Sequence, residues 1–207
     1  AVCLNIAEDH LDWHESHDAY RAAKARVYDR TSGVCLYPAG DVVVENMVRQ
    51  ADLPAKTRTV GFTASAPAPD QLGLVASTVV DRAFTDTGSP LVSSPGETSS
   101  PGQTLADINN LVHLSPPGQK LLAHTVSNAL AAIGLARVVG TSADAIATGL
   151  ANYTPGEHRF SLVATLDQVR YINDSKATNA HAAAAALSAF GPGEVVWLVG
   201  GLAKGAH

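Results

Sequence analysis

Cysteine is scarce in this sequence, and the two cysteines that occur have no structural spacing. Cys3 and Cys35 form neither a CxxC pair nor a pattern typical of metal sites among the 207 residues. A disulfide framework and a cysteine-based metal site are therefore excluded as organising features. Both side chains are interpreted as free thiols of a reducing compartment, so we expect the protein to be cytoplasmic.

Long apolar runs and an excess of positive charge are missing as well. No apolar stretch reaches the roughly 18 residues that a membrane helix needs, and we expect no signal peptide. The formal net charge is −5, which argues against nucleic acid as a default partner. The sequence therefore predicts neither a membrane nor a nucleic acid as a partner.

The motif GxxxxGK followed by Ser or Thr, whose loop cradles nucleotide phosphates, is also absent. The turn Gly200–Gly205 has a similar content of glycine and lysine but does not match it. Any phosphate loop must then lie outside this sequence. The sequence opens within a strand-like run at Ala1 and stops at His207, where a helix is expected, so we interpret it as an internal fragment of a longer protein.

What is present is an ordinary apolar content of 46%, enough for a sizeable core in one large or two modest domains. Strand and helix patterns alternate, which predicts an α/β fold. Strands are expected at residues 1–6, 34–37 and 58–62, strand pieces within 72–84, and helices at about 16–28, 42–51, 119–139 and 141–150. Residues 85–103 are rich in Ser, Thr, Pro and Gly and are expected to form a mobile surface loop.

The pattern changes near Tyr153–Gly156, where we place a boundary between residues 1–154 and 155–207. Beyond it we expect strands at 160–166, 169–173 and 195–199 and a helix at 180–190. A helix between two strands of one sheet implies a right-handed crossover. The turns 173–179 and 200–205 would then lie at the same edge of the sheet, where open α/β sheets bind ligands.

The first of these turns, Asn173-Asp174-Ser175-Lys176-Ala177-Thr178-Asn179, combines a carboxylate, an ammonium group, two hydroxyls and two amides. Hydroxyls and free N–H groups at a helix start favour an anionic ligand. Helix capping by Asp174 or Ser175 is a plainer interpretation. The second lysine-bearing turn at the same edge favours a ligand site over capping alone.

The helix expected at about 16–28, with Ser16 or Asp18 as its cap, bears one lysine of special interest. Its apolar face is formed by residues at helical spacing, namely Tyr20, Ala23, Val27 and Tyr28. Lys24 falls beside that face, so its side chain either extends outward or has a buried role.

Three histidines, His10, His14 and His17, precede this helix at a spacing that would suit zinc if all three were on one helix. Because His10 directly follows an expected strand, we expect it to lie on a loop. That placement disfavours a zinc site.

Taken together, these stretches resemble the Mur ligase family, and the string Asp-Ser-Lys-Ala-Thr-Asn resembles its D-glutamate-adding branch. Other stretches agree in order and spacing: Leu4–Asp12, Tyr20–Lys24, Gly156–Phe160 and the Gly200-Gly201…Lys204 turn. Sister ligases share the Asp-His and Ala-Lys region but differ in the turn after Arg159.

The resemblance implies an α/β fold in which residues 1–154 are the C-terminal half of a central ATP-binding domain. Residues 155–207 would begin a Rossmann-like C-terminal domain that binds D-glutamate. It further implies a monomeric ligase that uses ATP and Mg²⁺ to add D-glutamate to UDP-N-acetylmuramoyl-L-alanine through an acyl phosphate, in peptidoglycan precursor synthesis. Without the phosphate loop, this chain alone is expected to be inactive. A sister Mur ligase, a folylpolyglutamate-type ligase and a non-catalytic ligand-binding fragment are the alternatives.

The resemblance also implies catalytic and metal-binding roles for single residues. His10, Lys24 and Lys176 would be catalytic, with His10 and the carbamate of Lys24 as ligands of Mg²⁺. A carbamate supplies the hard oxygen ligands that this ion prefers. Asp9, Lys176, Thr178 and Lys204 would bind substrate, because lysine and threonine suit a carboxylate.

For ATP, the resemblance implies contacts from Asn128, Arg159 and Asp174. One departure concerns the adenine. The family usually has His-Asn-x-x-Asn at the start of its long helix, whereas His124-Thr125-Val126-Ser127-Asn128 stands here. Asn128 fits, but Thr125 replaces the first asparagine.

Overall fold

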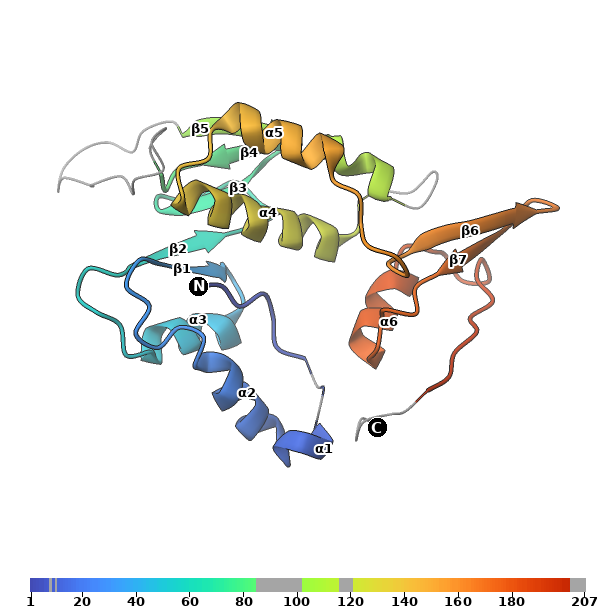
Figure 1. The fold of residues 1–207 in the computed structure, drawn as a ribbon, viewed down its shortest axis with the longest axis horizontal. Coiled ribbons are helices and arrows are strands. Elements are labelled where there is room, and N and C mark those ends of the chain that lie inside the picture. The colour runs from blue at the N-terminus through green and yellow to red at the C-terminus, as the bar shows by residue number, and fades with distance from the viewer. Residues whose placement is uncertain (8, 10, 85–101, 116–120, 202–207) are drawn as a thin grey trace.

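The computed structural model describes residues 1–207 except 8, 10, 85–101, 116–120 and 202–207 (Figure 1). The first part of the chain contains α1 (Leu11–His14), α2 (His17–Ala25), β1 (Val34–Pro38), α3 (Val42–Gln50), β2 (Arg58–Phe62), β3 (Gln71–Val75), β4 (Thr78–Asp81), β5 (Gln103–Asp107), the 3₁₀ helix η1 (Ile108–Leu114), α4 (Ala123–Val138) and α5 (Ala143–Asn152). The second part contains β6 (Ser161–Leu166), β7 (Val169–Asn173) and α6 (Ala180–Leu187). The predicted α/β class is confirmed.

The first part is built on a five-stranded mixed sheet in the order β1-β2-β3-β4-β5. β1, β2 and β3 run parallel, and β4 and β5 continue the sheet as antiparallel strands. Helix α4 contacts β1, β2 and β3, while α5 contacts β5 and α4. The two long helices therefore cover one face of the sheet together.

Strand β1 shows why this sheet is covered on both faces. Val34 and Leu36 point into the core beneath α4, whereas Cys35 packs with Val44 and Met47 of α3 on the other side. Successive side chains of a strand point to opposite faces, so the apolar run Val34–Leu36 needs apolar partners on both. Leu36 touches α4 so closely that a Cβ on Gly134 would lie 3.0 Å from its Cδ1 atom.

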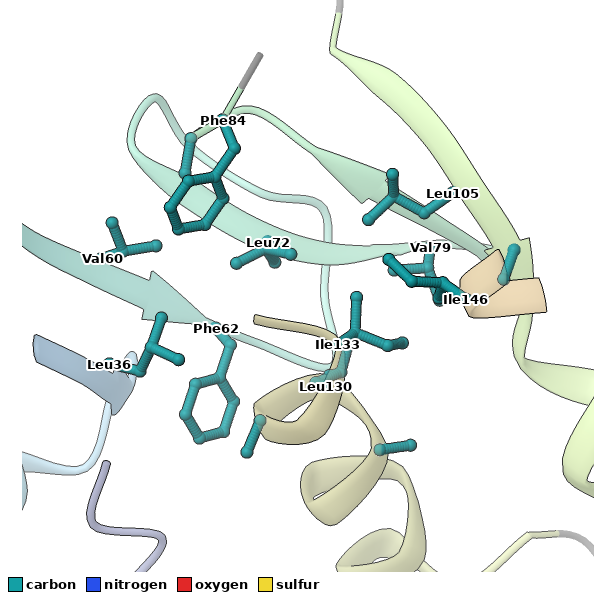
Figure 2. Packing of buried hydrophobic residues seen from close by; sticks show 14 of the residues in the cluster. Leu36, Val60, Phe62, Leu72, Val79, Phe84, Leu105, Leu130, Ile133 and Ile146 are labelled. Carbon is teal, nitrogen blue, oxygen red and sulfur yellow. The ribbon is translucent and has the colours of Figure 1, made fainter. Parts of the chain in front are cut away.

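The main core lies between the sheet and helices α4 and α5 (Figure 2). Large apolar side chains come from all five strands and both helices: Leu36, Val60, Phe62, Leu72, Val79, Leu105, Leu130, Ile133 and Ile146. Each fully buried side chain of this size stabilises the fold by about 1.5–3 kcal/mol. This core fixes α4, whose N-terminal end bears His124 and Asn128.

One ion pair is buried completely within this part of the molecule. The Arg137 Nε atom of α4 donates to Asp81 Oδ2 of β4 at 2.9 Å, and neither side chain has exposed surface. Arg137 also donates to the Thr141 carbonyl at 3.0 Å and to Gln103 Oε1 at 2.9 Å. The other carboxylate oxygen of Asp81 accepts the N–H groups of Ala83 and Phe84. Arg137 of α4 thus has partners in β4, in β5 and in the turn before α5, and Asp81 also accepts from the residues that follow β4.

Replacement of Arg137 by methionine is expected to lower the free energy of unfolding by about 3–5 kcal/mol, because it leaves a buried, unpaired carboxylate. Urea unfolding followed by circular dichroism measures this change. Arg49→Met is the control, since Arg49 is exposed on α3, and it should change stability by about 0.5 kcal/mol or less. Equal losses for the two variants would contradict the structural role of the buried pair.

Several predicted elements agree closely with the structure because their start signals are local. β2 has the expected bounds, and α3 begins after Asp41, whose carboxylate accepts the N–H groups of Val43 and Val44. Ser16 and Ser142 cap α2 and α5 as expected. A side-chain acceptor at the N-cap satisfies N–H groups that have no partner within the helix.

Residues 1–6 were expected to form a strand, and they do not form a regular one. Val2 makes a single parallel bridge with Leu36, and the Leu36 N–H donates to the Ala1 carbonyl at 2.8 Å. The buried Tyr28 hydroxyl accepts the Cys3 N–H at 2.9 Å and donates to the Leu36 carbonyl at 2.8 Å. A side chain thus takes the place of further strand pairing at this edge.

The helix expected at about 16–28 is shorter than predicted. α2 ends at Ala25, and the N–H groups of Val27 and Tyr28 bond to carbonyls three residues back. This tighter turn directs Tyr28 inward, while Ala23 and Val27 of the expected apolar face are exposed. The expected loop at 85–103 falls largely on residues outside the described structure, and Gln103 itself begins β5.

In the second part, β6 and β7 form an antiparallel hairpin around Asp167 and Gln168, and α6 follows β7. The strand expected at 195–199 is not formed, so the predicted crossover is wrong for the described residues. Val196 and Leu198 are each 90% exposed. An apolar run becomes a buried strand only where neighbouring strands and covering side chains are available, and the described part of the chain supplies none beside 195–199.

Candidate functional site

Two turns of the second part are joined by hydrogen bonds into one polar surface. The Phe160 N–H donates to Asp174 Oδ1 at 3.0 Å, and the Lys176 N–H donates to the His158 carbonyl at 3.1 Å. The side chains of Asn173 and His158 also meet, with 2.9 Å between Asn173 Nδ2 and His158 Nδ1. Arg159, Asp174 and Lys176, which the sequence analysis singled out, therefore lie on adjoining turns.

Arg159 stands between two residues with left-handed backbones. His158 has a φ of 64° and Phe160 a φ of 52°, a conformation that residues other than glycine adopt at some cost. The bonds to the 173–176 turn hold both residues, and the Phe160 ring stacks on Phe190 with 6.0 Å between ring centroids. The exposed Arg159 side chain is thus presented from a braced turn.

The strand-to-helix turn at 173–179 is confirmed, but its helix cap differs from the expected one. Neither Asp174 nor Ser175 caps α6; Asn179 does so, with its Oδ1 accepting the Ala182 N–H at 2.8 Å. Asp174 is instead bonded to Phe160, while Lys176 and Thr178 are exposed. The lysine and threonine are therefore accessible to an anionic ligand.

The same asparagine reaches the first part of the chain. Asn179 Nδ2 donates to Asp9 Oδ2 at 3.1 Å. Asp9 and Asn179 are 170 positions apart in the sequence, and both are partly buried. Asp9, a predicted substrate-binding residue, is therefore placed beside the turn that bears Lys176 and Thr178.

The N-terminal end of α4 approaches the same turn. Burial lowers the pKa of His124, and the negative charge of Asp174 partly offsets that lowering. Asn128, the predicted adenine contact, is exposed one helical turn after His124. Because side chains four positions apart share a helix face, Asn128 and His124 lie on one side of α4.

Replacing Asp174 by asparagine should lower the pKa of His124 further, because it removes the negative charge that favours the imidazolium form. An NMR titration of the His124 ring protons measures the shift. Since the pKa in the folded chain already lies below the ordinary 6.5, acidification through that value favours the unfolded chain, and the variant should be more acid-sensitive. Asp167→Asn, on the exposed hairpin turn, is the control. An unchanged His124 pKa in the Asp174 variant would contradict the proximity of the two groups.

Lys24 is exposed, and its Nζ atom lies 5.4 Å from the centroid of the Tyr20 ring. The His14 ring packs edge-on against the same tyrosine, with 5.2 Å between centroids. An ammonium group over an aromatic face is attracted by the ring quadrupole. Of the two expectations for Lys24, the outward one is confirmed for the described structure.

Two predicted site residues, His10 and Lys204, lie outside the described residues. The metal role of His10, the zinc alternative that includes it, and the placement of Lys204 at the sheet edge therefore stay predictions. Among the described residues, no group of three or more His, Cys, Asp or Glu side chains is placed to hold a metal ion. None of the described helices is long and apolar enough to cross a membrane.

Sequence reasoning missed three contributors to this surface: His158, Phe160 and the two-sided role of Asn179. An asparagine directly before an alanine-rich run is a recognisable cap signal and would have identified the cap of α6. No local signal marks the left-handed residues at 158 and 160, because the bonds that hold them come from a turn about fifteen residues later.

An α/β fold with polar turns at strand ends is typical of ligand-binding enzymes. Comparison with known proteins identifies the family: residues 1–136 match the Mur ligase middle domain, so this chain belongs to the Mur ligase family. The predicted resemblance is confirmed.

Curated relatives agree along the whole chain. It is 44% identical over 206 residues to a protein of Streptomyces coelicolor and 46% identical over 206 residues to one of Streptomyces avermitilis, each named UDP-N-acetylmuramoylalanine--D-glutamate ligase. A Thermobifida fusca protein of the same name is 43% identical over 206 residues. In each case the match covers 100% of this chain and 40% of the relative, so the chain spans about two fifths of their length.

A solved structure shares the fold. The crystal structure of MurF from Acinetobacter baumannii aligns with 92% of this chain and 37% of its own, with a TM-score of 0.52 and 19% sequence identity. That likeness supports the α/β architecture of the family.

Proposed function

We propose that this chain is part of an ATP-dependent ligase that joins D-glutamate to UDP-N-acetylmuramoyl-L-alanine through an acyl phosphate, in peptidoglycan precursor synthesis. The observation that carries the proposal is the 43–46% identity, along the whole chain, to relatives named for that ligation. The turn Asn173–Asn179, whose residues distinguish this branch from sister ligases, lies beside Arg159 and Asp9. A sister Mur ligase or a folylpolyglutamate-type ligase is disfavoured by that turn.

The proposal extends to the organisation of the whole protein. Residues 1–154 would be the C-terminal half of the central ATP-binding domain, and residues 155–207 the first part of the domain that binds D-glutamate. We propose a cytoplasmic, monomeric enzyme. Because the phosphate-loop motif is absent from this sequence, the 207-residue chain by itself is proposed to be a non-catalytic, ligand-binding piece.

Charge placement explains how these turns would serve the reaction. ATP supplies the phosphoryl group that activates the substrate carboxylate, and such transfer depends on positioning and on neutralising negative charge. Arg159 is a guanidinium presented on a braced turn beside Asp174. The arginine would hold the nucleotide phosphates and the aspartate its ribose. Asn128 would face the adenine from α4.

The acceptor would lie on the other side of the same turn. Lys176 and Thr178 are exposed and offer an ammonium group and a hydroxyl, which suit a carboxylate of D-glutamate. Lys204 would add a second cation. Asp9 would face the same substrate from the first part of the chain.

Magnesium is assigned with less support from the described residues. They contain no ready group of three metal-binding side chains, and the Lys24 ammonium lies over Tyr20. They do not by themselves supply a Mg²⁺ site. His10 and the carbamate of Lys24 remain its proposed ligands.

The direct test of the proposed activity is ligation by the full-length protein. Purified enzyme with ATP, Mg²⁺ and UDP-N-acetylmuramoyl-L-alanine should consume D-glutamate and release phosphate. L-lysine in place of D-glutamate tests for a sister Mur ligase. A glutamate-tailed folate in place of UDP-N-acetylmuramoyl-L-alanine tests for a folylpolyglutamate-type ligase. Turnover with either and none with D-glutamate would assign the protein to another branch.

Lys24→Ala in the full-length enzyme should abolish ligation, because the proposed carbamate is lost. Short carboxylic acids added to the variant should restore part of the activity by supplying the missing oxygen ligands. Steady-state rates with and without such acids measure both effects. Lys56→Ala, which removes an exposed lysine before β2, is the control. Full activity of the Lys24 variant at ordinary bicarbonate would rule out the carbamate role.

Lys204→Ala and Arg159→Ala should affect different substrates. The loss of a charge-assisted contact costs about 1.5–3 kcal/mol, roughly ten- to a hundredfold in binding. The KM for D-glutamate should rise by that order in the Lys204 variant, with little change in the KM for ATP. Arg159→Ala should show the reverse pattern. A larger ATP defect in the Lys204 variant would mean that this lysine serves the nucleotide.

A further inference from the structure

We propose that Asn179 is a positioning residue that fastens the acceptor turn, residues 173–179, to Asp9 in the first part of the chain. The evidence is the use of both ends of one side-chain amide. Its oxygen caps α6 through the Ala182 N–H at 2.8 Å, and its nitrogen donates to Asp9 Oδ2 at 3.1 Å.

The chemistry of the amide explains why asparagine suits this position. Asn, Asp and Ser are comparable as N-caps, because each offers an oxygen to the free N–H groups of the first turn. Among them, only asparagine also carries N–H donors that can face a carboxylate. Aspartate would place two carboxylates together, and serine is too short to span both contacts. The position therefore needs asparagine for the link to Asp9, and not for the cap.

The bond joins parts of the chain that have separate sheets. Asp9 lies in the sequence between the segment beside β1 and α1, and the next helix, α2, carries Lys24. Asn179 ends the turn that carries Lys176 and Thr178 and begins α6. A hydrogen bond to a charged acceptor is stronger than one between neutral groups. Asn179 thus sets the position of Lys176 and Thr178 relative to Asp9.

Variants at this one position separate the link from the cap. Asn179→Asp and Asn179→Ser keep a capping oxygen and lose the bond to Asp9, whereas Asn179→Ala loses both. Hydrogen exchange of the 207-residue chain, resolved by residue, reports each contact. Amides of Ala182–Leu187 follow the cap, and the Glu15 amide, which donates to the Leu11 carbonyl at 2.9 Å, follows the Asp9 segment.

For Asn179→Asp and Asn179→Ser, exchange of the Glu15 amide should accelerate about tenfold, the effect of losing one hydrogen bond to a charged group, while α6 keeps its protection. The acceleration of exchange in Asn179→Asp should become smaller in high salt, since like-charge repulsion is screened. The acceleration in Asn179→Ser should not depend on salt in this way. Combining Asp9→Asn with Asn179→Asp should restore protection, because an amide again faces a carboxylate. Unchanged exchange of the Glu15 amide in both single variants, or failure of the double variant to restore its protection, would overturn the link.

The catalytic consequence rests on the proposed ligase function and has its own measurement. In the full-length enzyme, Asn179→Ser should lower kcat at least tenfold and change the KM for ATP less than threefold, because it misplaces groups without removing a nucleotide contact. Wild-type kcat in that variant would overturn the positioning role. A wild-type enzyme that does not use D-glutamate would refute the proposed function instead, and the exchange result would still decide the link.

Discussion

The fold of the first part depends on the buried positive charge of Arg137, which must be paired inside the protein. The Arg137 side chain has no exposed surface, and it is tolerated because its Nε, Nη1 and Nη2 atoms each donate to an oxygen partner. Those partners come from β4, β5 and the turn before α5. Because an unpaired buried charge is strongly unfavourable, the pair specifies where α4 lies against the antiparallel end of the sheet. The close packing of Leu36 against Gly134 holds the same half of the helix against β1.

The position of α4 also determines where the residues at its N-terminal end lie relative to the functional surface. The helix runs from the buried Arg137 back to His124 and Asn128, and His124 lies within the electrostatic influence of Asp174. From the other side, Asn179 links the turn to Asp9. The polar turns of the second part are therefore linked to the first part by one hydrogen bond, to Asp9, and by the electrostatic effect of Asp174 on His124. Holding groups in fixed relative positions lowers the barrier of a reaction between them, so such placement is what a reaction site on these turns would require.

Local signals explain which elements were predictable. The strands Val34–Pro38 and Arg58–Phe62 are short, largely apolar runs whose side chains are mostly buried. The helices α2, α3 and α5 each follow a residue whose side chain caps them, namely Ser16, Asp41 and Ser142. The polar turn 173–179 was predicted for the same reason, since a strand and an alanine-rich helix flank it. Family resemblance, and not pattern, supplied the roles of Lys24, Arg159 and Lys204.

Features that failed prediction depend on distant partners. The run at 195–199 has the composition of a buried strand, but composition cannot say whether a neighbouring strand is present. The Arg137–Asp81 pair spans 56 positions, and each residue alone is typical of a surface. The second role of Asn179 depends on a carboxylate 170 positions away. In each case the deciding contact is tertiary, so a window along the sequence does not contain it.

The left-handed pair around Arg159 has a consequence for the order in which this surface forms. The left-handed conformation costs each of these residues about 1–3 kcal/mol of free energy. The segment 156–160 is therefore not expected to adopt this conformation by itself. The bonds that hold it come from residues 173–176, which reach it only after β6 and β7 have paired. The turn that presents Arg159 therefore becomes ordered only once this hairpin has formed.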